Sequence, residues 1–268
     1  MPSIIERGFR FLISYQAIGK AVSSFLGLFE VPLLDFFSLL ERYSGYHYFT
    51  DLMSQMTRVY GSRVIPLGVS LSAVPAVSPT EEILNLVSRV ESLAIGYCHC
   101  RNKTKNCEND VWTCIHVGTA KSIEEISKKK PVKSATLEDV KELILKSNKA
   151  GLVHQLITAP SSDYFYVICN CCPCCCVMLR SAIRYGLGNT ALSSNFIATL
   201  DSERCTSCGE CVSRCNFGVC QIEETGFTFD PKKCVGCGLC VTACLEDALK
   251  MRRRELHEMN KRPLKPLA

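Results

Sequence analysis

Two copies of one cysteine spacing constrain this chain more than any other feature. They begin at Cys205 and Cys234, and each follows the pattern C-x-x-C-x-x-C-x-x-x-C. Three thiolates at those separations fit around one iron–sulfur cube, and the fourth thiolate of each run completes the other cube. The predicted ligand sets are therefore crossed. One set is Cys205, Cys208, Cys211 and Cys244, and the other is Cys234, Cys237, Cys240 and Cys215.

These residues resemble a bacterial-type ferredoxin that carries two [4Fe–4S] clusters, over roughly residues 195–251. The resemblance implies two β-hairpin-and-helix halves related by a pseudo-twofold axis, and a role in electron transfer. Gly209, Gly236 and Gly238 suit a backbone that must approach a cluster closely and direct its amides at sulfur.

One position in each run departs from that family. The family usually has proline after the fourth cysteine, whereas Asn216 and Leu245 stand there. Two zinc sites with four thiolates each are the alternative interpretation of the runs. A third cysteine at this spacing, in both copies, favours iron–sulfur clusters over zinc.

The number and spacing of the cysteines indicate the redox state of the cellular compartment. The chain has 19 cysteines in 268 residues, an odd number that clusters at metal-ligand spacings. Such a set is no disulfide framework, and thiolate ligation at this density indicates a reducing compartment. We therefore expect a cytoplasmic protein from an anaerobe, because exposed cubes are sensitive to oxygen.

Charge is unevenly distributed along the chain. The ferredoxin-like stretch has an excess of acidic residues, and the net charge of +5 comes from a basic tail that follows it. The acidic face suits steering onto a basic patch of a redox partner protein. No nucleic-acid partner is expected, because no aromatic residues or binding fold accompany the basic tail.

Residues 1–63 contain no cysteine and predict a mostly helical region. Apolar residues recur at helical spacing up to Pro32, and further helices are predicted at 33–43 and 48–60. Charged residues interrupt every apolar run before it reaches the roughly 20 residues of a transmembrane span. Peripheral membrane association through the first amphipathic helix is an alternative to packing within a helical domain.

The middle of the chain alternates helical and strand patterns. Residues 64–80 should be extended, and a helix should begin at Thr80 with a buried stripe that runs to Ala94. The other predicted elements are a helix at 136–149 with Gly151 as its stop, strands at 152–157 and 164–168, and a helix at 177–185.

Ten further cysteines lie upstream of the ferredoxin-like runs, and six of them occupy eight consecutive positions. They are Cys98, Cys100, Cys107, Cys114, Cys169, Cys171, Cys172, Cys174, Cys175 and Cys176. Cysteines of a hydrophobic core are not concentrated in this way, so at least one additional metal centre is predicted, with [4Fe–4S] favoured over zinc. One cluster with spare thiols, two cubes or a larger non-cubane cluster all remain open.

This upstream half is similar to a group of anaerobe iron–sulfur proteins that carry three short motifs before a two-cluster ferredoxin. The matching segments are Cys98-His-Cys100-Arg101, Gly151-Leu-Val-His154 and the block that starts at Cys169-Asn-Cys171. The resemblance implies shared architecture and redox use, and no established reaction.

Other residues near these motifs are weaker candidates. Histidines 99, 116 and 154 are candidate ligands or proton donors, or else hydrogen-bonded structural residues. Arginines 101, 180 and 184 are candidates to offset cluster charge, or else lie at the surface. Cys220 occupies a core position of the repeat and is predicted to be buried and not a ligand.

We therefore predict an α+β protein that transfers electrons to or from a partner oxidoreductase. Its predicted parts are a mostly helical N-terminal region (1–63), a cysteine-rich α/β middle domain (64–190), a ferredoxin-type two-cluster module with pseudo-twofold symmetry (195–251) and a basic tail (252–268). The alternative is a reductase whose upstream centre reduces a disulfide or a small molecule. A DNA-binding redox regulator is disfavoured, because no helix-turn-helix pattern accompanies the tail.

Overall fold

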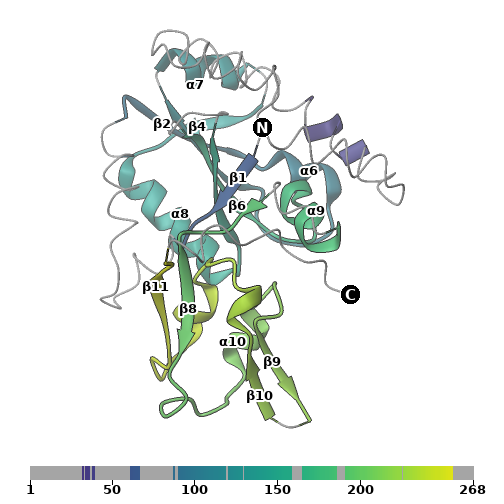
Figure 1. Ribbon diagram of the computed structural model, residues 1–268. Helices are drawn as coiled ribbons and strands as arrows, with labels where there is room; N and C mark the ends of the chain where they lie inside the picture. Colours follow the sequence, from purple (N-terminus) through teal and green to yellow (C-terminus); the bar gives the residue numbers. More distant parts are fainter. Residues whose placement is uncertain are drawn as a thin grey trace.

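The computed structural model describes residues 32, 34–36, 38–39, 61–66, 87, 90–118, 120–128, 130–158, 165–185, 191–224 and 226–255. Within them, a seven-stranded sheet with flanking helices forms a larger unit, and a smaller module with two short sheets lies beneath it in Figure 1. This mixture of helices and strands agrees with the predicted α+β class.

The predicted N-terminal helical region lies mostly outside the described residues. Residues 34–36 and 38–39 are helical, in agreement with the helix predicted at 33–43, and Pro32 is itself helical. The predicted amphipathic helix before Pro32, on which the alternative of peripheral membrane association depends, lies outside the described residues. The helix predicted at 48–60 also lies outside them. No helix in the described part is long and apolar enough to cross a membrane.

The larger unit is built on a sheet with the strand order β4-β2-β3-β6-β5-β1-β7. These strands are β1 (Gly61–Val64), β2 (Ser92–Tyr97), β3 (Trp112–Gly118), β4 (Val132–Ser134), β5 (Val153–Thr158), β6 (Phe165–Cys171) and β7 (Ala191–Leu192). Neighbouring strands are antiparallel except β1 and β7, which are parallel. Strand β1 therefore joins the end of the predicted helical region to the sheet, and β5 and β6 confirm both strands predicted beside the cysteine block.

Helices lie on both faces of this sheet. They are α6 (His99–Thr104), α7 (Ala120–Ser127), α8 (Leu137–Lys149) and α9 (Val177–Tyr185). Figure 1 shows α8 on one side of the sheet and α6 with α9 on the other. Ile115 and Ile168 lie opposite each other on β3 and β6 and pack with Ile144 of α8. Because strand residues alternate between faces, Cys114 and Cys169 project to the other side.

Helix α8 shows the predicted capping. The Thr136 hydroxyl accepts a hydrogen bond from the Asp139 amide, and the Asp139 carboxylate accepts one from the Thr136 amide. This reciprocal pair satisfies two amides that the first turn leaves without helical partners. At the other end, Gly151 takes a φ of 74°, as expected of the residue that stops the helix. Helix α9 spans the predicted residues 177–185.

The helix predicted from Thr80 to Ala94 is wrong at its C-terminal end. Val87 is helical, but Ala94 is fully buried in strand β2, between β3 and β4. Leu93 and Ile95 follow the two-residue alternation of a strand and pack on the α8 side of the sheet. Strand β2 forms hydrogen bonds with β3 on one edge and with β4 on the other, and this pairing outweighs the helical periodicity of the segment.

The smaller module consists of short elements around the two cysteine runs. They are β8 (Phe196–Leu200), α10 (Glu210–Arg214), β9 (Cys220–Glu223), β10 (Gly226–Phe229), the 3-10 helix η1 (Pro231–Lys233), α11 (Leu239–Ala243) and β11 (Leu249–Arg253). Strand β8 pairs with β11, and β9 pairs with β10 in a hairpin. Each run passes through a glycine with positive φ, Gly209 or Gly238, directly into its five-residue helix.

The start of the predicted basic tail belongs to this module. Strand β11 continues to Arg253, two residues past the predicted boundary, and pairs with Phe196. The next residue, Arg254, is buried and donates hydrogen bonds to the carbonyl oxygens of Ser194 and Cys234. Arg254 thus holds the beginning of β8 against the second cysteine run instead of lying in solvent.

The two units meet at the C-terminal end of α8. The guanidinium of Arg214 donates to the carbonyl oxygens of Asn148 and Lys149, at 2.5 and 2.6 Å. Thr242 of α11 donates from its hydroxyl to the side-chain oxygen of Asn148 at 2.9 Å. A cation at this end of a helix pairs with carbonyl groups that have no helical partner and with the negative end of the helix dipole.

Replacing Arg214 with methionine should loosen this junction. Hydrogen bonds from a charged donor contribute roughly 1.5–3 kcal/mol, and partial exposure of Arg214 places the expected loss near the lower limit. Hydrogen–deuterium exchange of the last turn of α8 should therefore be about 10-fold faster. Arg253→Met, at an exposed position on β11, is the matched control. Equal exchange in the two variants would show that Arg214 does not hold the units together.

Candidate metal centres

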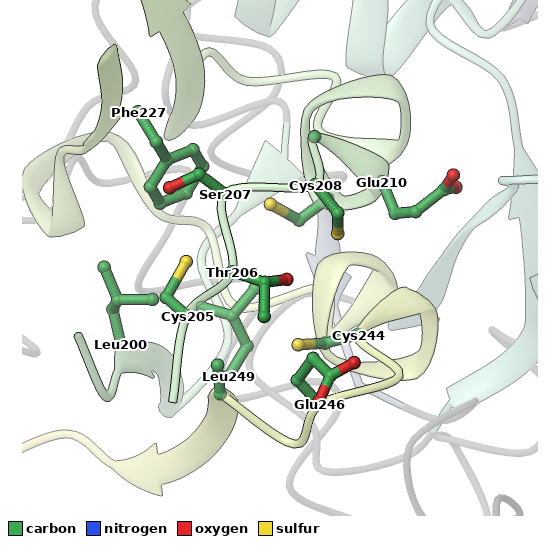
Figure 2. A pocket seen from close by; sticks show the side chains of 13 residues that line it. Leu200, Cys205, Thr206, Ser207, Cys208, Glu210, Phe227, Cys244, Glu246 and Leu249 are labelled. Carbon is green, nitrogen blue, oxygen red and sulfur yellow. The ribbon is translucent and has the colours of Figure 1, made fainter. Parts of the chain in front are cut away.

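The first cavity of the smaller module is lined by thiols from both runs. Cys205, Cys208, Cys211 and Cys244 border about 360 Å³ of empty space, together with Phe227 and other side chains. Figure 2 shows the sulfur atoms of Cys205, Cys208 and Cys244 directed into the centre of this cavity. These are the four cysteines that the spacing assigns to one cluster, and the fourth comes from the other run.

A second cavity lies on the opposite half of the module. Cys215, Cys234, Cys237 and Cys240 line it and border about 300 Å³ of empty space. Again three thiols come from one run and the fourth comes from the other. The structure therefore brings the eight cysteines together in the two crossed groups that their spacing predicts.

Backbone amides point at two of these sulfur atoms. The Ala198 amide donates to Cys234 Sγ at 3.5 Å, and the Val219 amide donates to Cys215 Sγ at 3.2 Å. Hydrogen bonds from the Cys220 thiol and from nearby backbone amides lower the pKa of Cys215 to about 5, against the effect of burial. Donors of this kind stabilise a thiolate and adjust the potential of a cluster that it holds.

Cys220 is 2% exposed, which confirms the prediction that it is buried. Its thiol donates to Cys215, and this contact and a second one to Cys240 raise its own pKa far above the ordinary range. Cys220 lines neither cavity. It therefore lies against the thiols of Cys215 and Cys240 as a neutral neighbour.

Two separate four-thiol cavities joined by crossed runs define an iron–sulfur module of the ferredoxin type. Comparison with known families agrees, because residues 204–249 match the family described as "4Fe-4S dicluster domain". This match assigns [4Fe–4S] binding to the smaller module. No curated protein matches the chain.

The ten upstream cysteines divide into two groups in the structure. Cys171 ends strand β6 on the face that carries Cys169, whereas Cys172 belongs to the turn that follows and packs in a different cluster of side chains. The first group is Cys98, Cys100, Cys114, Cys169, Cys171 and Cys176. The second group is Cys107, Cys172, Cys174 and Cys175. We call them the six-thiol group and the four-thiol group.

Members of the six-thiol group form a continuous series of sulfur contacts. The thiol of Cys114 interacts with Cys98 and Cys169, and that of Cys176 interacts with Cys100 and Cys171. A contact between Cys169 and Cys171 joins the two halves. Hydrogen bonds from their neighbours lower the pKa of Cys114 and Cys176, whereas Cys98, Cys100 and Cys171 have raised pKa values.

Gln155 is a polar neighbour of the six-thiol group that sequence reasoning missed. It is fully buried, donates to Cys176 Sγ at 3.7 Å and accepts a hydrogen bond from the Ser62 hydroxyl at 2.6 Å. Strand β1 therefore supports the group from far upstream in sequence. The one available signal was a glutamine next to His154 in a strand whose other central residues are apolar.

The four-thiol group is more compact. Cys107 Sγ lies 3.6 Å from Cys172 Sγ and 3.8 Å from Cys175 Sγ, and the sulfur atoms of Cys174 and Cys175 are 3.8 Å apart. All four sulfur atoms lie within 4.8 Å of one another. The Asn109 side chain donates to Cys107 at 3.5 Å, and hydrogen bonds from Asn109 help to lower the Cys107 pKa to about 6, against burial.

The three candidate histidines have different surroundings. The Nε2 atom of His99 lies 2.8 Å from a carboxylate oxygen of Asp35 and shares a hydrogen bond with it. His154 is fully buried and shares a hydrogen bond of 2.6 Å with Asn170, and burial lowers its pKa to about 4. His116 is also fully buried, and burial lowers its pKa to about 3. His154 and His116 are therefore neutral at neutral pH.

Arg101 is the candidate arginine that the structure places at the thiols. It is 1% exposed, and it donates to the Thr113 hydroxyl, the carbonyl oxygens of Asp110 and Asn170, and Cys172 Sγ. The alternative prediction, that Arg101 lies at the protein surface, is therefore wrong. Arg180, half-buried on α9, donates to the Cys174 carbonyl oxygen at 3.3 Å.

Proposed function

We propose that this protein is an electron carrier or electron-transfer subunit. The observation that carries the proposal is the dicluster domain at residues 204–249, with eight thiols gathered at two cavities. We assign one [4Fe–4S] cluster to Cys205, Cys208, Cys211 and Cys244. We assign the other to Cys234, Cys237, Cys240 and Cys215. Each cluster would carry one electron at a time.

A third centre in the six-thiol group would extend this relay. Its cysteines belong to the same continuous cluster of packed side chains as Cys211, Cys234 and Cys240 of the smaller module. Six thiols exceed the four that a cube needs, so this group has enough ligands for a cube or for a larger iron–sulfur cluster. This continuous packing supports electron transfer between the two units, because it places thiols of both units in one cluster of side chains.

The first cavity is the expected entry or exit point for electrons. Cys208 is exposed, whereas Cys234 and Cys240 at the second cavity are buried. Arg214 lines the second cavity and also contacts α8 of the larger unit. A redox partner protein with a basic patch would therefore dock on the acidic module near Cys208, and electrons would pass through the second cluster to the upstream centre.

Iron and acid-labile sulfide per chain, measured without oxygen, test this proposal. We expect about twelve iron atoms or more, with electron paramagnetic resonance signals from the reduced ferredoxin clusters and from a further centre. About eight iron atoms would contradict the third centre and leave the ferredoxin role intact. An absence of reducible clusters would contradict the electron-transfer function itself.

A reductase is the second candidate, and the surplus thiols of the six-thiol group favour it. If four of them held a cube, two would remain near the cluster to exchange with a disulfide substrate. Such an enzyme would take two electrons, one at a time, from the ferredoxin clusters. A signal of the upstream centre that changes on addition of a disulfide would favour the reductase, and an unchanged signal would favour the carrier.

A further inference from the structure

We propose that Cys107, Cys172, Cys174 and Cys175 hold a single metal ion in tetrahedral coordination, separate from every iron–sulfur cluster. The ion is of the class that four thiolates select, namely zinc or a single iron. This site goes beyond the proposed electron-transfer function, because its role is to hold two segments of the larger unit together.

The spacing of the sulfur atoms is the first argument. Metal–sulfur bonds of about 2.3 Å in a tetrahedron place the sulfur atoms about 3.8 Å apart. The three Sγ–Sγ distances along the group are 3.6, 3.8 and 3.8 Å. A four-iron cube inserts iron and sulfide atoms between its thiolates and holds them further apart than one ion does. The four-thiol group therefore fits one ion.

The ferredoxin cavities give an internal comparison. Their eight cysteines line two cavities that are partly open to solvent. Among the described residues, the four-thiol group alone brings three or more metal-ligand atoms within 4.8 Å of one another. The cysteines that match a [4Fe–4S] family are thus more widely spaced than those of the four-thiol group.

The charge of Arg101 is an independent argument. Its guanidinium is buried, and no carboxylate is among its hydrogen-bond partners. A buried charge requires compensation by an opposite charge. Four thiolates around a divalent ion carry a net charge of about −2, and Cys172 Sγ lies 3.6 Å from Arg101. The Asp110 carboxylate also interacts with this charge but accepts no hydrogen bond from the guanidinium, and a thiolate–metal centre would place negative charge in direct contact with it.

The fold suggests what the ion does. Cys107 lies in the segment between α6 and β3, whereas Cys172, Cys174 and Cys175 lie in the turn between β6 and α9. Asn106 also connects the two segments, by donating to the Cys174 carbonyl oxygen at 3.1 Å. An ion at this point would fix the turn that orients Cys171 and Cys176 in the six-thiol group.

Metal analysis of the full-length protein, purified without oxygen, tests the site. We expect either one zinc per chain or one iron in excess of acid-labile sulfide, since a lone ion brings no sulfide. After exchange with Co²⁺, a single cobalt per chain should show the strong visible absorption of a tetrahedral thiolate complex. The proposal would be overturned if the purified protein contained equal amounts of iron and acid-labile sulfide and no zinc, and if it bound no cobalt after the exchange.

Two variants locate the ion. Cys174→Ser should lower the zinc or excess iron by one per chain and leave acid-labile sulfide unchanged. Cys100→Ser, in the six-thiol group, is the matched control and should leave the single ion in place. Loss of sulfide together with iron in Cys174→Ser would show that the four-thiol group holds a cluster, and would overturn the proposal. If Cys174→Ser does not fold, the stoichiometry and cobalt spectrum of the unaltered protein decide the question.

Discussion

The double variant Cys205→Ala/Cys244→Ala should retain one of the two ferredoxin clusters. The double variant Cys205→Ala/Cys215→Ala should have both clusters damaged. The reason is the crossed arrangement of the two runs. Cys205 and Cys244 line the same cavity although they belong to different runs, and Cys215 lines the other cavity. Removal of two ligands from one site leaves two thiols, which are too few to hold a cube.

Iron content and the electron paramagnetic resonance spectrum of the reduced protein measure this effect. Relative to the unaltered protein, Cys205→Ala/Cys244→Ala should lose about four iron atoms and retain one ferredoxin signal. Cys205→Ala/Cys215→Ala should lose up to about eight iron atoms and both signals. An uncrossed arrangement predicts the reverse, because Cys205 and Cys215 would then serve one cluster. The upstream centre should persist in both variants, and its loss would contradict the division into separate units.

Gly236→Ala should prevent the second run from forming its cluster site. A Cβ atom at this position would lie 2.0 Å from the Phe196 carbonyl oxygen and 2.8 Å from the Ser194 Cβ. The chain cannot move away easily, because the Ser194 amide donates to the Val235 carbonyl oxygen and Arg254 links Ser194 to Cys234. The clash is with backbone, so the loop that carries Cys234 must shift.

Gly226→Ala separates this clash from backbone strain. Gly226 also has a positive φ, 114°, but nothing lies within 4 Å of an added Cβ. The control should therefore be destabilised only by the unfavourable positive φ of an alanine at this position, by about 1–3 kcal/mol, and should retain both clusters. Gly236→Ala should lose the second cluster, which iron analysis and the reduced spectrum would reveal. Equal iron content in both variants would show that the loop adapts to the side chain.

The ferredoxin module was the part most open to prediction from sequence. Its ligands come in short runs, so chain geometry alone places three thiols of each run together. The glycines expected at close approaches, Gly209, Gly236 and Gly238, all have positive φ. Helix α8 was equally clear, because its capping residues Thr136 and Asp139 are close neighbours in the chain and interact without help from the rest of the fold.

The upstream half was less predictable, because its contacts join segments far apart in sequence. Ala94 continues a helical stripe, yet strands β3 and β4 hold it in a sheet. Arg101 could be interpreted as a surface residue or as a partner of the cysteines, and only its burial against Thr113 and Asn170 decides between them. Neither outcome has a local signal in the sequence.

The cysteine runs by themselves predicted a ferredoxin-type [4Fe–4S] module and the crossed grouping of its eight cysteines at two cavities. The tertiary structure alone decided how the ten upstream cysteines divide. Cys171 and Cys172 are adjacent in the chain, but the first faces the six-thiol group and the second joins Cys107 in the four-thiol group. The physical reason is that ligands within one short loop are set by spacing, whereas ligands from separate segments meet only after strand register and sheet faces are established.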